Sequence, residues 1–213
     1  MPYRVKEIFY TLQGEGLHAG RPAVLCRFSG CNLWSGREVD RGKSICSFCD
    51  TDFVGTDGAG GGTFRDPGQL AAAVAAMFPP TRPSRVRPFV VCTGGEPLLQ
   101  LDSALVRSFH ESGFEVAIET NGTCAAPDNI DWICVSPKGD AQLALKSGHE
   151  LKLLFPQKNA MPETFESLEF QYFFLQPIDG PDLDNHTARA VEYCLNHPQW
   201  RLSLQTHKLI DIR

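Results

Sequence analysis

The chain has 213 residues, of which 42% are apolar and 21% charged, and its net charge is −5. This composition is typical of a globular protein whose length suits one core of ordinary size. No run of about 18 apolar residues exists and no stretch collects Lys or Arg, so we expect neither a membrane nor a nucleic acid as partner. The N-terminal segment MPYRVKEIFY lacks the apolar core of a signal peptide, which predicts a cytoplasmic location.

Short runs of β-branched and aromatic residues alternate with helical segments along the chain. The runs predict seven buried strands, at Ala23–Phe28, Phe89–Cys92, Phe114–Ile118, Trp132–Val135, Leu151–Phe155, Tyr172–Leu175 and Arg201–Gln205. Helices are predicted from Pro67, capped by Asp66, to Phe78; from about Pro97 to Ser112, before Gly113; and from near Asn185 to before Pro198. Strands separated by helices pair in parallel. The helix content is too low for a closed eight-fold barrel, so the sequence predicts an α/β fold, an open partial (β/α) barrel.

Two segments lack any regular periodicity. Asn32–Ile45 is mostly polar, and Gly55–Gly62 is rich in glycine, which predicts a flexible loop. Polar motifs instead follow four of the predicted strands directly: Ser29-Gly30-Cys31, Thr93-Gly94-Gly95-Glu96-Pro97, Glu119-Thr120-Asn121-Gly122 and Ser136-Pro137-Lys138. Turns favour the same residue types, but the carboxyl ends of parallel strands share one edge, where ligands bind. The four motifs together therefore predict one large site.

Eight cysteines are a high number for a cytoplasmic chain, in which disulfides are disfavoured. Cys31-x14-Cys46-x2-Cys49 offers three thiolates just after a strand, and thiolates are ligands of both iron–sulfur clusters and zinc. A cluster held by three cysteines leaves one iron open to a cofactor. The alternative is a zinc site with Cys26 as the fourth ligand, although Cys26 lies within an apolar strand and would point into the core.

The residues around these cysteines favour a cofactor site over structural zinc. The turn at Gly94 and Gly95 exposes backbone groups that can hold an amino-acid moiety, and Glu96 can pair with an ammonium group. Phe48, directly before Cys49, offers an aromatic face to a flat ring such as adenine. A structural zinc site requires none of these features.

These motifs resemble the radical S-adenosylmethionine (SAM) superfamily, with three close cysteines, an aromatic residue before the last one, and Gly-Gly-Glu-Pro after the next strand. The usual spacing there is C-x3-C-x2-C, whereas fourteen residues fill the first gap here. The chain resembles the 7-carboxy-7-deazaguanine synthase family, in which lengthened gaps occur. Four further segments carry this narrower resemblance: Phe9–Gly16, Cys26-Arg27-Phe28, Cys49-Asp50-Thr51 and Ser136-Pro137-Lys138.

The resemblance implies one radical SAM domain over residues 1–213, with a cluster loop at 29–51 and a 4Fe–4S cluster on Cys31, Cys46 and Cys49. The open iron would bind SAM, and an electron from a flavodoxin-type donor would cleave SAM to a radical. That radical would convert 6-carboxy-5,6,7,8-tetrahydropterin to 7-carboxy-7-deazaguanine with loss of ammonia. The implied SAM-binding residues are Phe48, Cys49, Asp50, Gly94, Gly95, Glu96, Ser136, Pro137 and Lys138.

The resemblance supplies the substrate, and the chemistry of the side chains indicates which residues suit it. Leu12-Gln13-Gly14-Glu15 offers an amide and a carboxylate that suit the guanine-like edge of a pterin; the alternative is that Gln13 and Glu15 face solvent in a turn. Arg27 alternates with Cys26 and suits a substrate carboxylate, and its alternative partner is a protein acid. Thr93 can also reach the substrate.

The resemblance further implies that Thr51 is a Mg²⁺ ligand and that the chain forms a homodimer. Two other functions remain open from the sequence. One is a radical SAM activase that generates a glycyl radical on a protein partner, and it would not require Arg27 or the turn at Gln13–Glu15. The other is a zinc-stabilised binding module.

Overall fold

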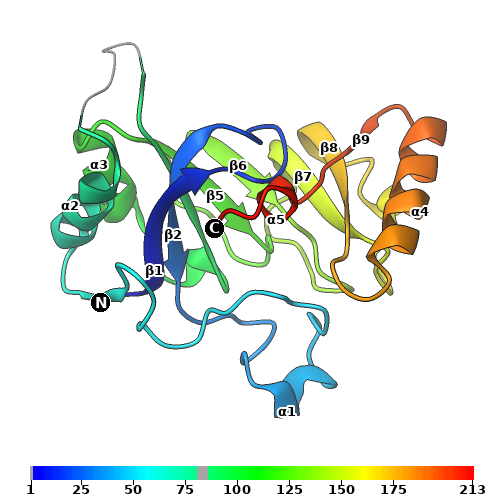
Figure 1. Ribbon diagram of the computed structural model, residues 1–213, viewed down its shortest axis with the longest axis horizontal. Coiled ribbons are helices and arrows are strands. Elements are labelled where there is room, and N and C mark those ends of the chain that lie inside the picture. Colours follow the sequence, from blue (N-terminus) through cyan, green and yellow to red (C-terminus); the bar gives the residue numbers. More distant parts are fainter. Residues whose placement is uncertain (1, 81–85) are drawn as a thin grey trace.

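The computed structural model describes residues 2–80 and 86–213, and one sheet of nine strands forms its centre (Figure 1). The strands follow the order β3-β1-β2-β4-β5-β6-β7-β8-β9. Their bounds are β1 Tyr3–Leu12, β2 Pro22–Phe28, β3 Gly62–Phe64, β4 Phe89–Gly94, β5 Glu115–Thr120, β6 Trp132–Val135, β7 Ser147–Phe155, β8 Glu169–Pro177 and β9 Trp200–Leu202. The sheet is not closed, which confirms the open partial barrel.

From β2 through β4 to β9 in this order, each strand pairs in parallel with the next. β1 pairs antiparallel with both β2 and β3. Each of the seven predicted strands overlaps an observed one, but β7 begins four residues before its predicted start, and the prediction Arg201–Gln205 shares only Arg201 and Leu202 with β9. β1 and β3 are not among the predicted strands. β1 mixes charged with apolar residues, and β3 has only three residues after a glycine-rich segment.

The helices lie at the two ends of the sheet and around its carboxyl edge (Figure 1). Their bounds are α1 Glu38–Arg41, α2 Pro67–Met77, α3 Ser103–Glu111, α4 Leu183–Asn196 and α5 Thr206–Leu209, with 3-10 turns at Pro97–Leu99 and Pro162–Thr164. α2 packs on β1 and on α3, α3 packs on β5, and α4 packs on β8 and β9. No helix in the described ranges is long and apolar enough to span a bilayer.

Side-chain capping explains where α2 and α3 begin. The Asp66 side chain accepts a hydrogen bond from the backbone N–H of Gln69, which confirms it as the N-cap of α2. The prediction of one helix from Pro97 to Ser112 was wrong at its start. Pro97–Leu99 forms a separate 3-10 turn, and Asp102 caps α3 through the N–H of Leu105 at 2.9 Å.

The glycine-rich segment 55–62 packs closely on β1 and is not a free loop. Backbone hydrogen bonds join Ile8 N to the Ala59 oxygen at 2.8 Å and Gly58 N to the Lys6 oxygen at 2.9 Å. A Cβ at Gly61 would lie 2.1 Å from that Lys6 oxygen, so this contact requires glycine. The glycines therefore permit close approach to a strand, which composition alone could not distinguish from flexibility.

Strand alternation sorts the side chains of the sheet between its two faces. On β2, Cys26 and Phe28 are fully buried in the core that α2 and α3 cover. Leu25 and Arg27 point to the opposite face, where a cavity opens. The polar residues of this inner face form the candidate site.

Candidate active site

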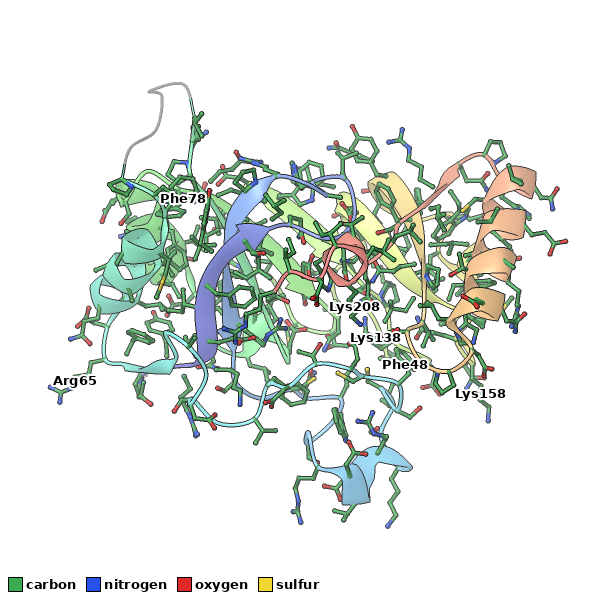
Figure 2. All side chains as sticks on the ribbon, in the orientation of Figure 1. Phe48, Arg65, Phe78, Lys138, Lys158 and Lys208 are labelled. Carbon is green, nitrogen blue, oxygen red and sulfur yellow. The ribbon has the colours of Figure 1, made fainter. Side chains whose placement is uncertain are left out.

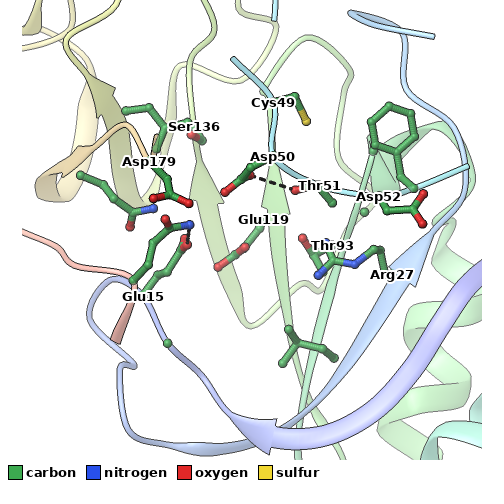
Figure 3. A pocket seen from close by; sticks show the side chains of 18 of the residues that line it. Glu15, Arg27, Cys49, Asp50, Thr51, Asp52, Thr93, Glu119, Ser136 and Asp179 are labelled. Atoms are coloured by element: carbon green, nitrogen blue, oxygen red, sulfur yellow. Dashed lines mark hydrogen bonds between the residues drawn. The ribbon is translucent and has the colours of Figure 1, made fainter. Parts of the chain in front are cut away.

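A cavity of about 370 Å³ opens at the carboxyl edge of the parallel strands. All four strand-end motifs contribute to its wall: Cys31 after β2, Thr93–Gly95 at the end of β4, Glu119–Asn121 at the end of β5, and Ser136 and Lys138 after β6. The prediction of one shared site at this edge is confirmed. The close-up in Figure 3 shows Cys49 and Ser136 at one side of this space and Glu15 and Arg27 at the other.

Cys31, Cys46 and Cys49 all line this cavity, although fourteen residues separate the first two. The loop between them includes α1, and Arg41 of this helix holds the loop in place. Its guanidinium donates to the backbone oxygens of Ser47 and Cys49 at 2.9 and 3.0 Å and stacks over the Trp34 ring at 4.1 Å. The long gap thus forms a small ordered unit that returns the chain to the cavity.

The three thiols differ in their acidity because their surroundings differ. A hydrogen bond from Cys46 lowers the pKa of the Cys49 thiol to about 6, and the same contact raises the pKa of Cys46. Burial raises the pKa of Cys31. The nearby Lys138 ammonium favours the thiolate form of both Cys46 and Cys49. The wall therefore already supports one thiolate, the form that binds iron.

In the described part of the chain, no three His, Cys, Asp or Glu side chains surround one point closely enough to hold a single metal ion. In a 4Fe–4S cluster each cysteine binds a different iron, so its ligands need not meet at one point. Three thiols around one cavity, with no fourth cysteine lining it, fit a cluster that leaves one iron open.

Cys26 lies outside this site. It is fully buried on the opposite face of β2 beside Cys92, in the core that α2 and α3 cover. The prediction that it points into the core is confirmed. A zinc site formed by Cys26 and the three loop cysteines would need this side chain to pass through the sheet, so the zinc-stabilised module is excluded.

The glycine turn after β4 lies directly against the start of the cluster loop. Gly95 N donates to the Phe28 oxygen at 3.3 Å, and Glu96 N donates to the Gly30 oxygen at 2.9 Å. A Cβ at Gly95 would lie 2.1 Å from the Gly30 oxygen. Glycine is therefore required for the close approach of the two segments.

Glu96 and Pro137 are the two predicted cofactor residues that do not line the cavity. The Glu96 carboxylate is buried and accepts hydrogen bonds from the Thr120 hydroxyl at 2.7 Å and the Asn121 N–H at 2.8 Å. The prediction that it pairs with an ammonium group does not fit this position, because it connects the ends of β4 and β5 instead. The Pro137 oxygen accepts from the Gln157 amide at 3.1 Å.

Lys138 reaches the same wall from the end of β6. Its ammonium donates to the backbone and side-chain oxygens of Ser136 at 2.8 and 2.5 Å. Burial lowers the pKa of Lys138. Figure 2 shows Lys138 between Phe48 and Lys208, which line the cavity with it.

Arg27 lies on the cavity wall, as predicted, and also has a protein partner. Its Nε donates to Glu7 at 2.8 Å, and the other Glu7 oxygen accepts from the Arg213 guanidinium at 2.5 Å. The two terminal nitrogens of Arg27 form no hydrogen bond with any described residue. The ion pair and a carboxylate ligand are thus compatible, because they use different edges of the guanidinium.

The turn after β1 also lines the cavity and does not face bulk solvent. Gln13 is buried, and its amide donates to Glu119 at 2.9 Å. Glu15 accepts from the Lys152 ammonium and from the Gln205 amide, the latter at 3.0 Å. Burial alone would raise the pKa of Glu15, but Lys152 lowers it to about 2. Leu12 and Gly14 complete this side of the wall.

Asp50 and Thr51 end the cluster loop, and Asp50 contacts the C-terminal segment through Lys208. The Lys208 ammonium bridges Asp50 at 2.7 Å and Asp179 at 2.6 Å. The Thr51 hydroxyl has only a long contact of 3.4 Å with Asp50 (Figure 3). Thr51 therefore has lone pairs open to the cavity.

Several cavity residues were absent from the predicted site. They are Glu119, Lys152, Gln176, Gln205, His207, Lys208 and Arg213, among others. Glu119 stands in a strand-end motif, so its position gave a signal. The others come from β7, β8 and the C-terminal segment, where no local motif marks them and only the tertiary fold brings them to the cavity.

The structure and its relatives identify the class of this protein. The solved structure of QueE from Escherichia coli matches with a TM-score of 0.71 and 28% identity, over 97% of this chain and 95% of that chain. Proteins from Bradyrhizobium diazoefficiens and Bordetella pertussis, both named 7-carboxy-7-deazaguanine synthase, are 62% and 63% identical over the full length of both chains. A scan of protein-family models finds no match. By fold and site the chain is a radical SAM enzyme.

More narrowly, the chain belongs to the 7-carboxy-7-deazaguanine synthase family. The same family includes a protein from Bacteroides thetaiotaomicron at 42% identity over the full length. Radical SAM lyases of queuosine biosynthesis make up this family. Membership removes the glycyl-radical activase from consideration, and it implies a 4Fe–4S cluster and SAM as cofactors.

The position of Cys26 yields a prediction that separates the core cysteine from the three cavity cysteines. Cys26→Ala should leave the iron content intact and cost on the order of 1 kcal/mol of stability, because it removes one small buried side chain. Alanine at Cys31, Cys46 or Cys49 should abolish the iron–sulfur absorbance and all SAM cleavage. The measurement is iron, sulfide and zinc content of the four variants purified without oxygen. Equal loss of metal in all four would contradict the three-cysteine cluster.

Proposed function

We propose that this chain converts 6-carboxy-5,6,7,8-tetrahydropterin to 7-carboxy-7-deazaguanine with loss of ammonia, using all of residues 1–213 as one radical SAM domain. Relatives named 7-carboxy-7-deazaguanine synthase match this chain at up to 63% identity over their full length. The observation that carries the proposal is a single cavity lined by three thiols, a glycine turn and an arginine with two unoccupied nitrogens.

Cys31, Cys46 and Cys49 are proposed to hold the cluster. When bound, the cluster and SAM supply a 5′-deoxyadenosyl radical that removes hydrogen from C6 of the substrate. The backbone at Gly94 and Gly95 would bind the amino-acid end of SAM.

The remaining SAM contacts come from side chains on the same wall. Lys138 and Ser136 suit the SAM carboxylate and ribose, because a buried ammonium beside a hydroxyl matches these groups. Phe48 offers its ring to the adenine, and Asp50 lies beside Cys49 at the same end of the cavity.

The substrate is proposed to lie between Arg27 and the turn after β1. The terminal nitrogens of Arg27 would bind the substrate carboxylate in a two-point contact. The backbone of Leu12 and Gly14 and the side chains of Gln13 and Glu15 line the region that suits the pterin edge. Thr93, at the end of β4, faces the same space (Figure 3).

Mg²⁺ is proposed to bind Thr51, with substrate oxygens and water in its remaining positions. The Thr51 hydroxyl, whose contact with Asp50 is long at 3.4 Å, is a hard oxygen ligand of the kind that Mg²⁺ prefers.

Three further proposals concern the setting of the reaction. A flavodoxin-type protein would supply the electron, the active form would be a homodimer, and the enzyme would work in the cytoplasm. All eight cysteines are unpaired, which suits a reducing compartment.

The experiment that tests the function is anaerobic incubation of the reconstituted enzyme with SAM, a reductant and the tetrahydropterin. Mass detection of a deazaguanine carboxylic acid and of released ammonia is the expected result. Absence of that acid, with SAM cleavage intact, would reject this substrate.

Arg27→Ala should raise KM for the tetrahydropterin strongly while SAM cleavage remains possible. Truncating one partner of a buried charged contact should cost about 2–5 kcal/mol in kcat/KM. Arg21→Ala is the matched control, because Arg21 pairs with Glu115 at 2.7 Å and does not line the cavity. An unchanged kcat/KM in Arg27→Ala would remove this residue from the substrate site.

Thr51→Ala should remove most of the stimulation of turnover by Mg²⁺, because it deletes the proposed protein ligand. The measurement is the steady-state rate over a Mg²⁺ titration after removal of metal by chelation. Thr63→Ala, at an exposed position of β3, should respond to Mg²⁺ as the unmodified enzyme does. A Thr51→Ala enzyme with the same Mg²⁺ dependence as this control would show that the assignment is wrong.

A further inference from the structure

A lysine is buried in the inner face of the sheet at the bottom of the cavity. Lys152 of β7 has a side chain that is only 4% exposed, and it forms ion pairs with Glu15 and Glu119. Its ammonium lies 3.2 Å from Oε1 of Glu119 and closer still to Glu15. Glu15 comes from the turn after β1 and Glu119 from β5, so one ammonium joins three separate segments around the cavity.

The hydrogen bonds of Glu119 leave one of its oxygens open. Oε1 accepts from both Lys152 and the Gln13 amide, at 3.2 and 2.9 Å. Oε2 accepts no hydrogen bond from the described residues, and the side chain is about a quarter exposed in the cavity wall. Glu119 is therefore a carboxylate whose orientation is set by one oxygen while the other faces the ligand space.

The charges around Lys152 make its presence necessary for this arrangement. Glu150 lies two residues earlier on β7, is buried, and accepts from the Leu17 N–H at 3.1 Å without lining the cavity. Three carboxylates thus lie around one ammonium in a region of low dielectric. Like charges in such a place repel strongly, and without the lysine they would take up protons or turn away.

Burial by itself would lower the pKa of Lys152, but Glu119 and Glu15 together raise it well above its ordinary value. The pKa of Glu15 is correspondingly lowered to about 2, while burial raises the pKa of Glu150. The titratable groups that face Lys152 also include Cys134 of β6, and Lys138 lies within electrostatic range. The ammonium is thus charged, and so is Glu15.

We infer that Lys152 is a positioning residue, which orients Glu119 and Glu15 so that the open Glu119 oxygen can accept a hydrogen bond from an N–H of the substrate ring. This inference rests on the proposed function, because a pterin is the ligand that supplies those N–H groups. Lys152 forms hydrogen bonds with Glu15 and Glu119, and none with the three cavity cysteines or the described residues assigned to SAM. Its loss should therefore weaken substrate binding and leave the SAM half of the site unchanged.

The test uses Lys152→Met, which keeps a long side chain and removes the charge. KM for the tetrahydropterin should rise at least about tenfold with a smaller change in kcat, as expected when a ground-state contact is lost. The paramagnetic resonance spectrum of the reduced cluster with SAM should stay as in the unmodified enzyme. Arg21→Met is the matched control, because it removes the charge of an ion pair, with Glu115 at 2.7 Å, that lies outside the cavity, and its KM should stay within about twofold.

A double-mutant cycle separates positioning from general stability. Glu119→Gln keeps the size of the side chain and should raise KM in the same way as Lys152→Met. Because Lys152 acts through Glu119, the double variant should raise KM no more than the larger single change. Lys152→Arg, which restores the charge, should recover part of the lost affinity.

Three results would overturn the inference: an unchanged KM in Lys152→Met, fully additive effects in the cycle, or equal loss of the SAM-dependent spectrum. If Lys152→Met does not fold, KM and the SAM-dependent spectrum are measured in Lys152→Arg and Glu119→Gln instead. An unchanged KM in Glu119→Gln would then overturn the inference. The proposed function fails separately, by absence of the deazaguanine acid in the unmodified enzyme.

Discussion

The close contact between the end of β2 and the turn after β4 is the constraint on which the rest of the site depends. Gly95 approaches Gly30 so closely that no side chain fits between them, and Glu96 then donates its N–H to the Gly30 oxygen. Cys31, the first of the three cysteines proposed to hold the cluster, directly follows Gly30. The same turn places Glu96 where its carboxylate binds the Thr120 hydroxyl at the end of β5. One glycine contact therefore fixes the distance between the cluster loop, the proposed SAM turn and the next strand.

Most of the fold could be predicted from the sequence because buried parallel strands are short apolar runs with turn residues after them. β6 was predicted at its observed bounds, Trp132–Val135. The strand β1 is not a buried apolar run, since it pairs antiparallel between β2 and β3, and an irregularity between Val5 and Glu7 interrupts its alternation of apolar and charged residues. The segment 55–62 shows a second limit, because glycine permits both flexibility and close packing and only the neighbouring strand decides between them.

The candidate site likewise contains residues that local motifs predict and residues that only the tertiary fold brings together. Residues that stand in local motifs, such as Cys46, Cys49 and Thr93, were found because strand ends gather at one edge. Lys152 was not found, since no turn or local motif marks its position in β7 and its ion-pair partners lie on other segments. Its partners are 33 and 137 residues away in sequence. Such a residue becomes meaningful only when the inner face of the sheet is assembled.

The distribution of partners among the basic side chains of the cavity indicates where negatively charged ligand groups can bind. Five lysines and arginines line it: Arg27, Lys138, Lys152, Lys208 and Arg213. Lys152, Lys208 and Arg213 form ion pairs with protein carboxylates, and so does the Nε edge of Arg27. Among the described residues, this leaves the Lys138 ammonium, which meets only the uncharged oxygens of Ser136, and the terminal edge of Arg27. Two carboxylates enter the proposed reaction, one on SAM and one on the pterin. The Lys138 ammonium and the terminal edge of Arg27 are two cationic positions without a carboxylate partner, which equals the number of ligand carboxylates. Because the other cations of the wall already have carboxylate partners, each ligand carboxylate is directed to its own end of the cavity.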